Sequence, residues 1–185
     1  MLLPFSLAFR GLHVGRYGRD EHLVGNLYLG WPFLMRGYSQ SDVRDSCVES
    51  EEVQGNDCTL YGDELIGTRV GVANVELRVP VFQQIVLGGS FGLPPVEGFA
   101  FFDAGTAWGN TPLQNLGTGQ RQLVRSSPNF KRGVAPGADE RGVMTSMGVG
   151  GRVNLFGYAV LEAVYVNPLE RDRGWHWQFA LQPGF

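Results

Sequence analysis

Apolar and polar residues alternate one by one along much of the chain, most regularly toward the C-terminus. Over residues 175–185, apolar side chains take every second position from Trp175 to Phe185. Residues 146–155 and 158–166 show the same alternation. A period of two places successive side chains on opposite faces of a β-strand, and helical periodicity is nearly absent. The pattern therefore predicts a strand in each of these three ranges.

The same period predicts three earlier strands. They cover residues 3–16, 69–81 and 97–108. The third alternates less regularly, because Phe99 and Phe101 share a face with Asp103. Together the six ranges predict an all-β, antiparallel fold in one domain, residues 1–185.

Short and long connections alternate between these strands. A tight turn that contains glycine joins Asn154 to Tyr158, a moderate charged loop covers 167–174, and residues 82–96 are intermediate. The two long connections are residues 18–66 and 109–143. Short turns on one side and long loops on the other are typical of outer-membrane barrels.

Composition excludes several classes of protein. The formal net charge is −3, so we expect no nucleic-acid partner. Hydrophobic residues make up 43% of the chain, too many for a disordered protein. No run of about 18 apolar residues occurs, which excludes a transmembrane helix. A mean hydropathy of −0.08 remains compatible with membrane strands, which turn one face to lipid and the other to water.

Two features favour lipid as the environment of the apolar face. Aromatic residues gather near the ends of the predicted strands, as in the interfacial girdles of barrels. The opposite face carries large polar side chains, which a hydrated lumen accommodates and a small dry core does not. They are Arg10, Glu76, Arg78, Arg152, Glu162, His176 and Gln178. The alternative is a soluble β-sandwich with solvated polar faces.

The last predicted strand resembles the C-terminal signature of bacterial outer-membrane proteins. Its alternating apolar residues end in an aromatic, and they include Trp177, Phe179, Leu181 and Phe185. In those proteins such a terminus is the sorting signal that the insertion machinery reads. The resemblance implies the bacterial outer membrane as the location and the lipid bilayer as a partner.

Two motifs resemble a particular family. Met35-Arg36-Gly37-Tyr38 lies within residues 18–66, and the run Gly98-Phe99-Ala100-Phe101-Phe102-Asp103-Ala104-Gly105 lies on the third predicted strand. The first resembles the V-R-G-[FY] tip of the inward-folded loop in the outer-membrane insertase superfamily, which includes BamA, TamA and two-partner secretion transporters. The second resembles the G-x-[FY]-x-D-x-G-like element of an adjacent barrel strand. Met35 stands where the family commonly has Val.

This resemblance implies the last six strands of a sixteen-stranded transmembrane barrel. Residues 18–66 would be the inward-folding extracellular loop, and 109–143 a second long extracellular loop. Ten further strands and periplasmic POTRA domains would lie outside this sequence. The implied function is non-enzymatic and needs no cofactor: the barrel opens sideways to insert or translocate unfolded client polypeptides, and residues 175–185 form one side of the opening.

Other architectures and branches stay open. A small closed barrel with a structural, adhesive or pore role would need two more strands, in residues 23–34 and 118–130. A two-partner secretion transporter carries the same motifs as an insertase. The sequence does not separate these family branches.

If the loop folds into the lumen, the guanidinium of Arg36 leaves bulk water and needs an acceptor. Asp103 is the best candidate, and an Arg–Asp pair can be bidentate. Glu76 and Glu162 are alternative acceptors on the same face. We further expect Gly37 to permit a tight backbone, Phe101 to pack against Tyr38, and Gly105 to belong to the same lumen-facing element. A solvated loop arginine is the alternative for Arg36.

Two cysteines, Cys47 and Cys58, lie in one acidic segment of the 18–66 loop. An even pair in such a segment indicates a disulfide in an oxidising compartment, with two free thiols as the alternative. The acidic residues show no fixed ligand spacing, so we expect no metal site. The histidines are scattered and no nucleophile or phosphate-binding motif occurs, so we expect no enzyme.

Overall fold

The computed structural model describes residues 5–39, 65–82, 85–86, 92–114, 121–132 and 140–183. These residues are nearly all β, as the alternation predicts. Seven long strands carry the fold: β1 (Ser6–Gly15), β4 (Arg69–Phe82), β7 (Val96–Gln114), β8 (Arg121–Arg132), β9 (Glu140–Leu155), β10 (Ala159–Pro168) and β11 (His176–Pro183). The short elements are the 3-10 helix η1 (Glu21–Val24) and the strands β2 (Leu27–Tyr28), β3 (Ile66–Gly67), β5 (Ile85–Val86) and β6 (Gly92–Leu93). No helix among the described residues is long and apolar enough to cross a membrane.

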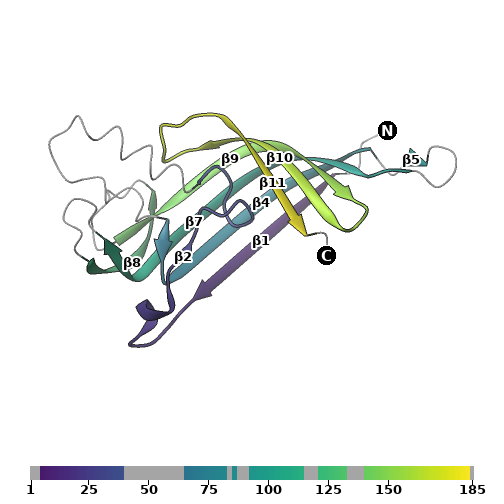
Figure 1. The fold of residues 1–185 in the computed structure, drawn as a ribbon. Coiled ribbons are helices and arrows are strands. Elements are labelled where there is room, and N and C mark those ends of the chain that lie inside the picture. The colour runs from purple at the N-terminus through teal and green to yellow at the C-terminus, as the bar shows by residue number, and fades with distance from the viewer. Residues whose placement is uncertain are drawn as a thin grey trace.

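The seven long strands form one curved sheet in the order β1-β4-β7-β8-β9-β10-β11 (Figure 1). Consecutive strands pair antiparallel from β1 to β7 and from β9 to β11. In the middle, β7 pairs directly with β9, residues 96–105 against 144–153. Within the described residues the sheet is open, with β1 and β11 at its two edges. The six predicted strands correspond to β1, β4, β7, β9, β10 and β11.

The expectation of a plain loop over residues 109–143 needs correction. The strand β7 continues to Gln114, β8 follows, and β9 begins at Glu140. The outer part of β7 pairs with residues 121–126 of β8, and Ser127 of β8 lies parallel to Glu140 of β9. A membrane strand needs only about 9–11 residues. The residues by which β7 and β9 exceed this length pair through their backbones with β8. Backbone pairing does not require apolar residues at alternate positions, so the sequence shows no such alternation there.

The closed-barrel alternative required strands in two places. Residues 118–130 do contain most of β8, although it joins the outer ends of β7 and β9 rather than spanning the sheet alone. Residues 23–34 hold the end of η1 and the two-residue strand β2, which pairs with β3. Residues 23–34 therefore contain no strand that spans the sheet.

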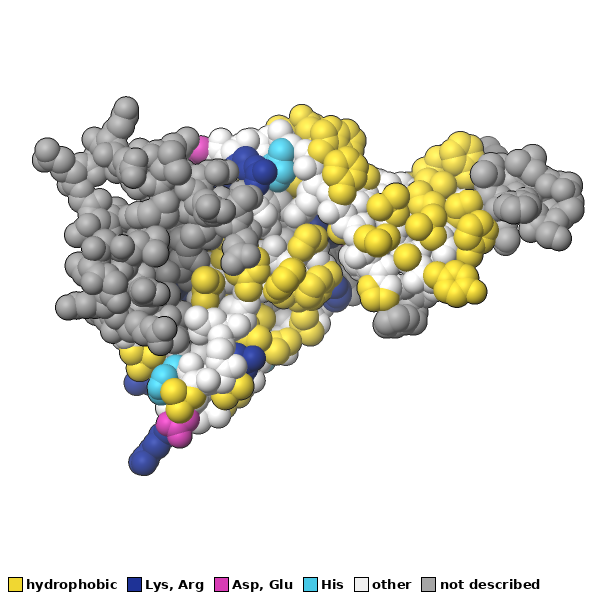
Figure 2. Space-filling model, viewed as in Figure 1, with side chains coloured by type: hydrophobic (Ala, Val, Ile, Leu, Met, Phe, Trp, Pro, Cys, Tyr) yellow, Lys and Arg dark blue, Asp and Glu magenta, His cyan; other side chains and the backbone are white. Residues whose placement is uncertain are grey.

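The two faces of the sheet differ in polarity in the sense of a membrane barrel. One step along β7, the side chain of Phe102 is 44% exposed whereas Asp103 is fully buried. The outward face carries exposed apolar side chains on every sheet-spanning strand, including Leu7, Phe9, Leu77, Phe102, Val149, Leu161, Trp177, Phe179 and Leu181. In the view of Figure 2, hydrophobic side chains cover the right-hand part of the molecule with few charged ones among them. Polar groups are buried on the opposite face. Apolar residues outside and polar residues inside are the arrangement of a membrane barrel, the reverse of a soluble one.

The described ends of the connection between β1 and β4 fold back against the polar face. The strands β2 and β3 pair with each other, and Leu29 N donates to Leu65 O at 2.7 Å. Beyond β2, the dark blue chain in Figure 1 returns to the middle of the sheet. Its apolar side chains pack with those of β4, β7 and β9 in a buried cluster of Leu29, Leu34, Met35, Tyr38, Leu65, Val70, Val72, Ala107 and Met144. This cluster fixes the position of residues 35–38.

Candidate functional site at a loop tip inside the sheet

The tip of the loop, residues 33–39, is a compact turn that only certain residues can form. Leu34 N and Met35 N both donate to the carbonyl of Trp31, at 2.8 and 2.9 Å. Gly37 has a φ of 86°, a conformation that L side chains rarely adopt. A Cβ on Gly37 would also lie 2.8 Å from Cγ2 of Val166. The expected tight turn is thus present at Gly37, and Gly37 also packs closely against Val166 of β10.

The floor under the tip is equally specific. A Cβ on Gly105 of β7 would lie 3.0 Å from Leu29 Cδ1 and 3.2 Å from Met35 Sδ. The absence of a side chain there lets the loop approach the backbone of the sheet. Gly37 and Gly105, one from each sequence motif, therefore both permit close contact between the loop and the wall.

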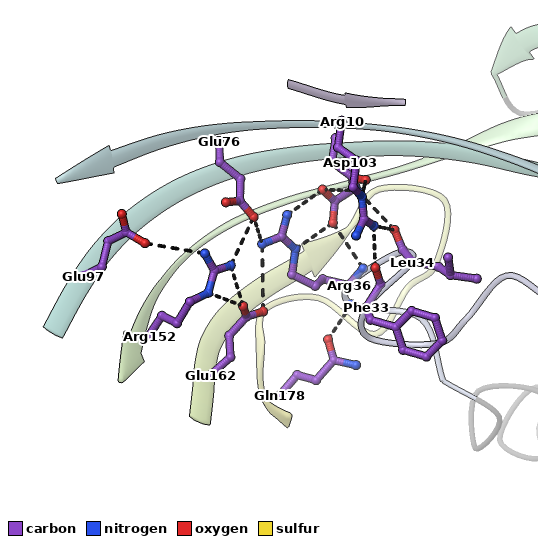
Figure 3. A network of polar contacts seen from close by, with 12 residues as sticks. Arg10, Phe33, Leu34, Arg36, Glu76, Glu97, Asp103, Arg152, Glu162 and Gln178 are labelled. Carbon is purple, nitrogen blue, oxygen red and sulfur yellow. Dashed lines mark hydrogen bonds and ion pairs between the residues drawn. The ribbon is translucent and has the colours of Figure 1, made fainter. Parts of the chain in front are cut away.

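Arg36 and Asp103 form a buried bidentate pair (Figure 3). Arg36 Nε donates to Asp103 Oδ2 at 2.8 Å, and Nη2 donates to Oδ1 at 2.7 Å. The backbone N–H of Arg36 adds a third bond to Oδ2 at 3.2 Å. The exposed fractions are 5% for Arg36 and 0% for Asp103. This is the contact that the sequence favoured, and it places the tip inside the curve of the sheet.

Both alternative acceptors also face the guanidinium. Arg36 Nη1 donates to Glu76 Oε1 at 2.7 Å and lies 3.9 Å from Glu162 Oε1. Burial opposes the positive charge, but Asp103 and Glu76 more than offset this and raise the pKa of Arg36 above its usual value. Arg36 therefore stays charged inside the protein.

Phe101 and Tyr38, which we expected to pack together, belong to different buried clusters. The guanidinium of Arg36 lies over the ring of Phe101, 3.7 Å from its centroid, in a cation–π contact. Phe101 belongs to a cluster with Phe99, Val164 and Val166, whereas Tyr38 packs in the other buried cluster. A strand-face argument from sequence could not reveal that the guanidinium of Arg36 stacks on the ring of Phe101.

A wider network extends the pair along the wall (Figure 3). Arg152 of β9 donates to Glu162 Oε2 at 2.7 Å and lies 3.4 Å from Glu76 Oε1 and 3.5 Å from Glu97 Oε2. Arg78 Nε donates to the other oxygen of Glu76 at 2.8 Å. Each buried carboxylate near Arg36 thus has a basic partner, which is the condition for keeping such charges out of water.

Asn74 is a contact residue that the sequence reasoning missed. Its Nδ2 donates to Asp103 Oδ1 at 2.8 Å and to the Leu34 carbonyl at 3.1 Å. Its Oδ1 accepts from Arg10 Nε at 2.8 Å, and Arg10 also reaches the carbonyls of Phe33 and Leu34. Asn74 lies directly opposite Asp103 in the β4–β7 register. Only a correct register, which the sequence did not supply, would have identified it.

Residues 37–39 of the tip contact β9, β11 and the connection between β10 and β11. Gly37 N donates to Gln178 Oε1 on β11 at 2.9 Å. The hydroxyl of Tyr38 shares its hydrogen between Thr145 O at 2.7 Å and Glu170 Oε2 at 2.9 Å. Arg173 Nη1 donates to Ser39 Oγ at 3.3 Å. Burial and the neighbouring Glu170 carboxylate raise the pKa of Tyr38, so the hydroxyl remains protonated and donates.

The arrangement of strands and the buried tip coincide with a family assignment. The family model for the Omp85 superfamily domain matches residues 3–181. The chain belongs to the Omp85 superfamily. Members of this superfamily are bacterial outer-membrane proteins, and membership supports insertion or translocation of polypeptides in general. Curated proteins and solved structures gave no match.

The Omp85 domain leaves a cavity of about 470 Å³ beside the network. Charged and polar side chains from five strands line it, among them Arg10, Glu76, Arg78, Arg152 and Gln182. A polar space of this size has room for water. Arg36 also lines the cavity, but its side chain is 6% exposed, compared with 36% for Arg78 and 22% for Arg152. The cavity extends from β1 to β11 across the inner side of the sheet.

A second ion pair holds the base of the loop in this Omp85 chain. Glu21 of η1 accepts from Arg69 Nη2 of β4 at 2.5 Å and from Asn110 Nδ2 of β7 at 2.7 Å. Burial opposes the charge of Glu21, but the hydrogen bonds from Arg69 and Asn110 outweigh it and lower the pKa of the carboxyl. The loop is therefore fixed at its base as well as at its tip.

The remaining predicted residues lie away from the tip or outside the described residues. The side chains of Trp177, Phe179 and Leu181 on β11 point outward and are more than half exposed, at 63%, 68% and 69%. Phe185, Cys47 and Cys58 are outside the described residues. In the described part of the chain, no group of three or more His, Cys, Asp or Glu side chains is placed to hold a metal ion.

Proposed function

We propose that this chain forms part of a bacterial outer-membrane barrel that inserts or translocates polypeptides through a lateral opening. The observation that carries the proposal is the bidentate Arg36–Asp103 pair, held with 5% and 0% exposure inside a sheet whose outer face is apolar. Burying a charge costs desolvation free energy, and the Arg36–Asp103 pair offsets this only when the loop adopts this one conformation. The network acts by holding the barrel wall and not by catalysis, and it needs no cofactor.

The two free edges of the sheet support a larger barrel. Within the described residues, β1 and β11 each lack a partner on one side, and their outward residues are apolar. Lipid cannot satisfy backbone N–H and C=O groups, so both edges need further strands. We assign β11 to one side of the lateral opening, where the strand of a client polypeptide would pair by β-augmentation. The strands that complete the barrel, and periplasmic POTRA domains, are proposed partners.

A charge-swap experiment in the full-length gene product tests the lock. Arg36→Asp places a fourth carboxylate beside Asp103, Glu76 and Glu162, and Asp103→Arg places a second guanidinium beside Arg36. Each single variant should lose most of its ability to assemble client outer-membrane proteins or export secreted ones. The double variant should recover part of it, because the pair is restored in reverse.

The base of the loop supplies a matched control. Swapping Glu21 and Arg69 exchanges another loop-to-wall ion pair, with an oxygen–nitrogen distance of 2.5 Å. The single control variants should reduce client assembly much less than the tip variants do. If Arg36→Asp and Asp103→Arg both support normal assembly while the protein is folded in the membrane, the proposed role of the lock is refuted.

A further inference from the structure

The tip contacts two different parts of the wall with its two halves. Arg36 faces β4 and β7, through Glu76 and Asp103. The next three residues each contact the last hairpin, which consists of β10, residues 169–175 and β11. Their partners are Gln178, Glu170 and Arg173 respectively. Four consecutive loop residues, 36–39, thus connect strands β4 and β7 to the last hairpin.

The contact of Tyr38 is the best defined on the hairpin side. Its side chain is fully buried, and its hydroxyl reaches Glu170 Oε2 at 2.9 Å. Glu170 is itself oriented by Thr145 of β9, whose Oγ1 donates to Oε1 at 2.8 Å and whose N–H donates to Oε2 at 2.5 Å. One carboxylate therefore joins the loop tip, β9 and the segment that precedes β11.

The contact of Gly37 acts on β11 itself. The N–H of Gly37 would be left without an acceptor if Gln178 moved away with β11, because the amide oxygen of Gln178 lies only 2.9 Å from it. Leaving a buried N–H unpaired is costly. Displacing β11 from its place in the wall therefore breaks bonds with the tip as well as with β10.

We infer that Tyr38 and Glu170, together with Gln178, are positioning residues that couple the buried loop tip to the final strand, so that the tip determines how readily β11 separates. This inference rests on the proposed function, in which β11 borders the lateral opening. It goes beyond the lock, because the Arg36–Asp103 pair would hold the loop even if the last hairpin were free. The hydroxyl of Tyr38 adds what a phenyl ring at that position could not.

Hydrogen–deuterium exchange on the full-length protein in lipid nanodiscs tests the coupling. The main variant is Tyr38→Phe, which keeps the ring in its apolar cluster and removes only the hydroxyl. Amides of residues 169–183 should exchange about tenfold faster or more, since a buried hydrogen bond to a charged group is lost. Amides of β4, residues 69–82, should keep their wild-type exchange. A merely structural role would raise exchange in both regions.

Two further variants separate the contact from general loosening. Tyr17→Phe removes another hydroxyl, which lies 2.6 Å from His13 Nε2 and far from Glu170 in the chain, so β11 should exchange as in wild type. In residues 169–183, Tyr38→Phe combined with Glu170→Ala should exchange no faster than Glu170→Ala alone. The only contact of the hydroxyl that remains in Glu170→Ala goes to Thr145 of β9 and not to these residues. Gln178→Leu should independently raise exchange in β11.

The outcomes distinguish this inference from the proposed function. Unchanged β11 exchange in both Tyr38→Phe and Gln178→Leu overturns the coupling. Normal client assembly in both Arg36→Asp and Asp103→Arg overturns the proposed role of the lock. Faster exchange confined to residues 169–183, with the double variant matching Glu170→Ala, supports the coupling whatever the clients are.

Discussion

The tip and the base of the loop are both fixed to the wall by an arginine–carboxylate pair, but the two pairs differ in setting. At the tip, the loop supplies the cation, Arg36, and the wall supplies Asp103, Glu76 and Glu162. At the base, the loop supplies the anion, Glu21, and the wall supplies Arg69. The side chain of Arg69 is 24% exposed, whereas that of Asp103 is not exposed at all.

This difference indicates two kinds of attachment. If the base opens, water can replace Glu21 as the partner of Arg69, because the guanidinium of Arg69 already contacts solvent. The guanidinium also stacks over Tyr17, 4.5 Å from the ring centroid. No such replacement is available to Asp103, which would be left as an uncompensated charge. The tip is thus an all-or-none contact, and the base can loosen gradually.

The largest expected contrast comes from removing one charge at each end. Arg36→Ala should lower the free energy of unfolding by about 3–5 kcal/mol, because Asp103 loses its buried partner. Glu21→Ala should cost about 1–3 kcal/mol, since Arg69 can turn to water. Urea unfolding of the lipid-reconstituted protein, followed by tryptophan fluorescence, measures both. Equal losses at the two ends would remove the distinction between them.

A pair of glycine variants sharpens the comparison. Gly37 and Gly25 have nearly the same φ, 86° and 89°, but an added Cβ meets Val166 at Gly37 and nothing within 4 Å at Gly25. Gly25→Ala should cost about 1–3 kcal/mol from backbone strain alone, because its φ of 89° and ψ of 164° lie in a region essentially restricted to glycine. Gly37→Ala should add to its own backbone strain about 1–3 kcal/mol from the clash. The same urea titration measures the difference. If the two variants are equally stable, the tip is not packed against β10 as described.

The smallest expected effect is a pH dependence at the base. The folded pKa of Glu21 is lowered, so its stabilising contribution is complete above the ordinary glutamate pKa and is lost as the pH falls through the folded value. Glu21→Gln should therefore be less stable than wild type near neutral pH, and this difference in stability should narrow as the pH falls below the ordinary glutamate pKa. Unfolding midpoints measured across this range test it. A gap that widens in acid would contradict the lowered pKa.

The sheet was predictable from sequence to the extent that one face of each strand meets an apolar environment. Burial of alternate residues imposes the period of two that identified the six sheet-spanning strands. In β8 and the outer halves of β7 and β9, backbone pairing holds the strands without such a face, so the sequence indicated only a loop.

The site was predictable only where a motif named both partners. The resemblance brought Arg36 and Asp103 together, and the shared polar face suggested Glu76 and Glu162. The positions of Asn74 and Glu170 depend on strand register and on how the loop lies over the sheet, which residue types alone do not determine. Phe101 illustrates the same limit, because assigning strand faces cannot show that a guanidinium stacks on its ring.

The register of β4 and β7 gives the buried tip a meaning for folding. Asn74 and Asp103 lie opposite each other, and both bind the tip. A slip of one residue would turn Asp103 outward toward lipid and Phe102 inward toward Arg36. The loop could not then seat, and its arginine would have no bidentate partner. The seated tip is therefore compatible with one register of β4 and β7, the one that places Asn74 opposite Asp103.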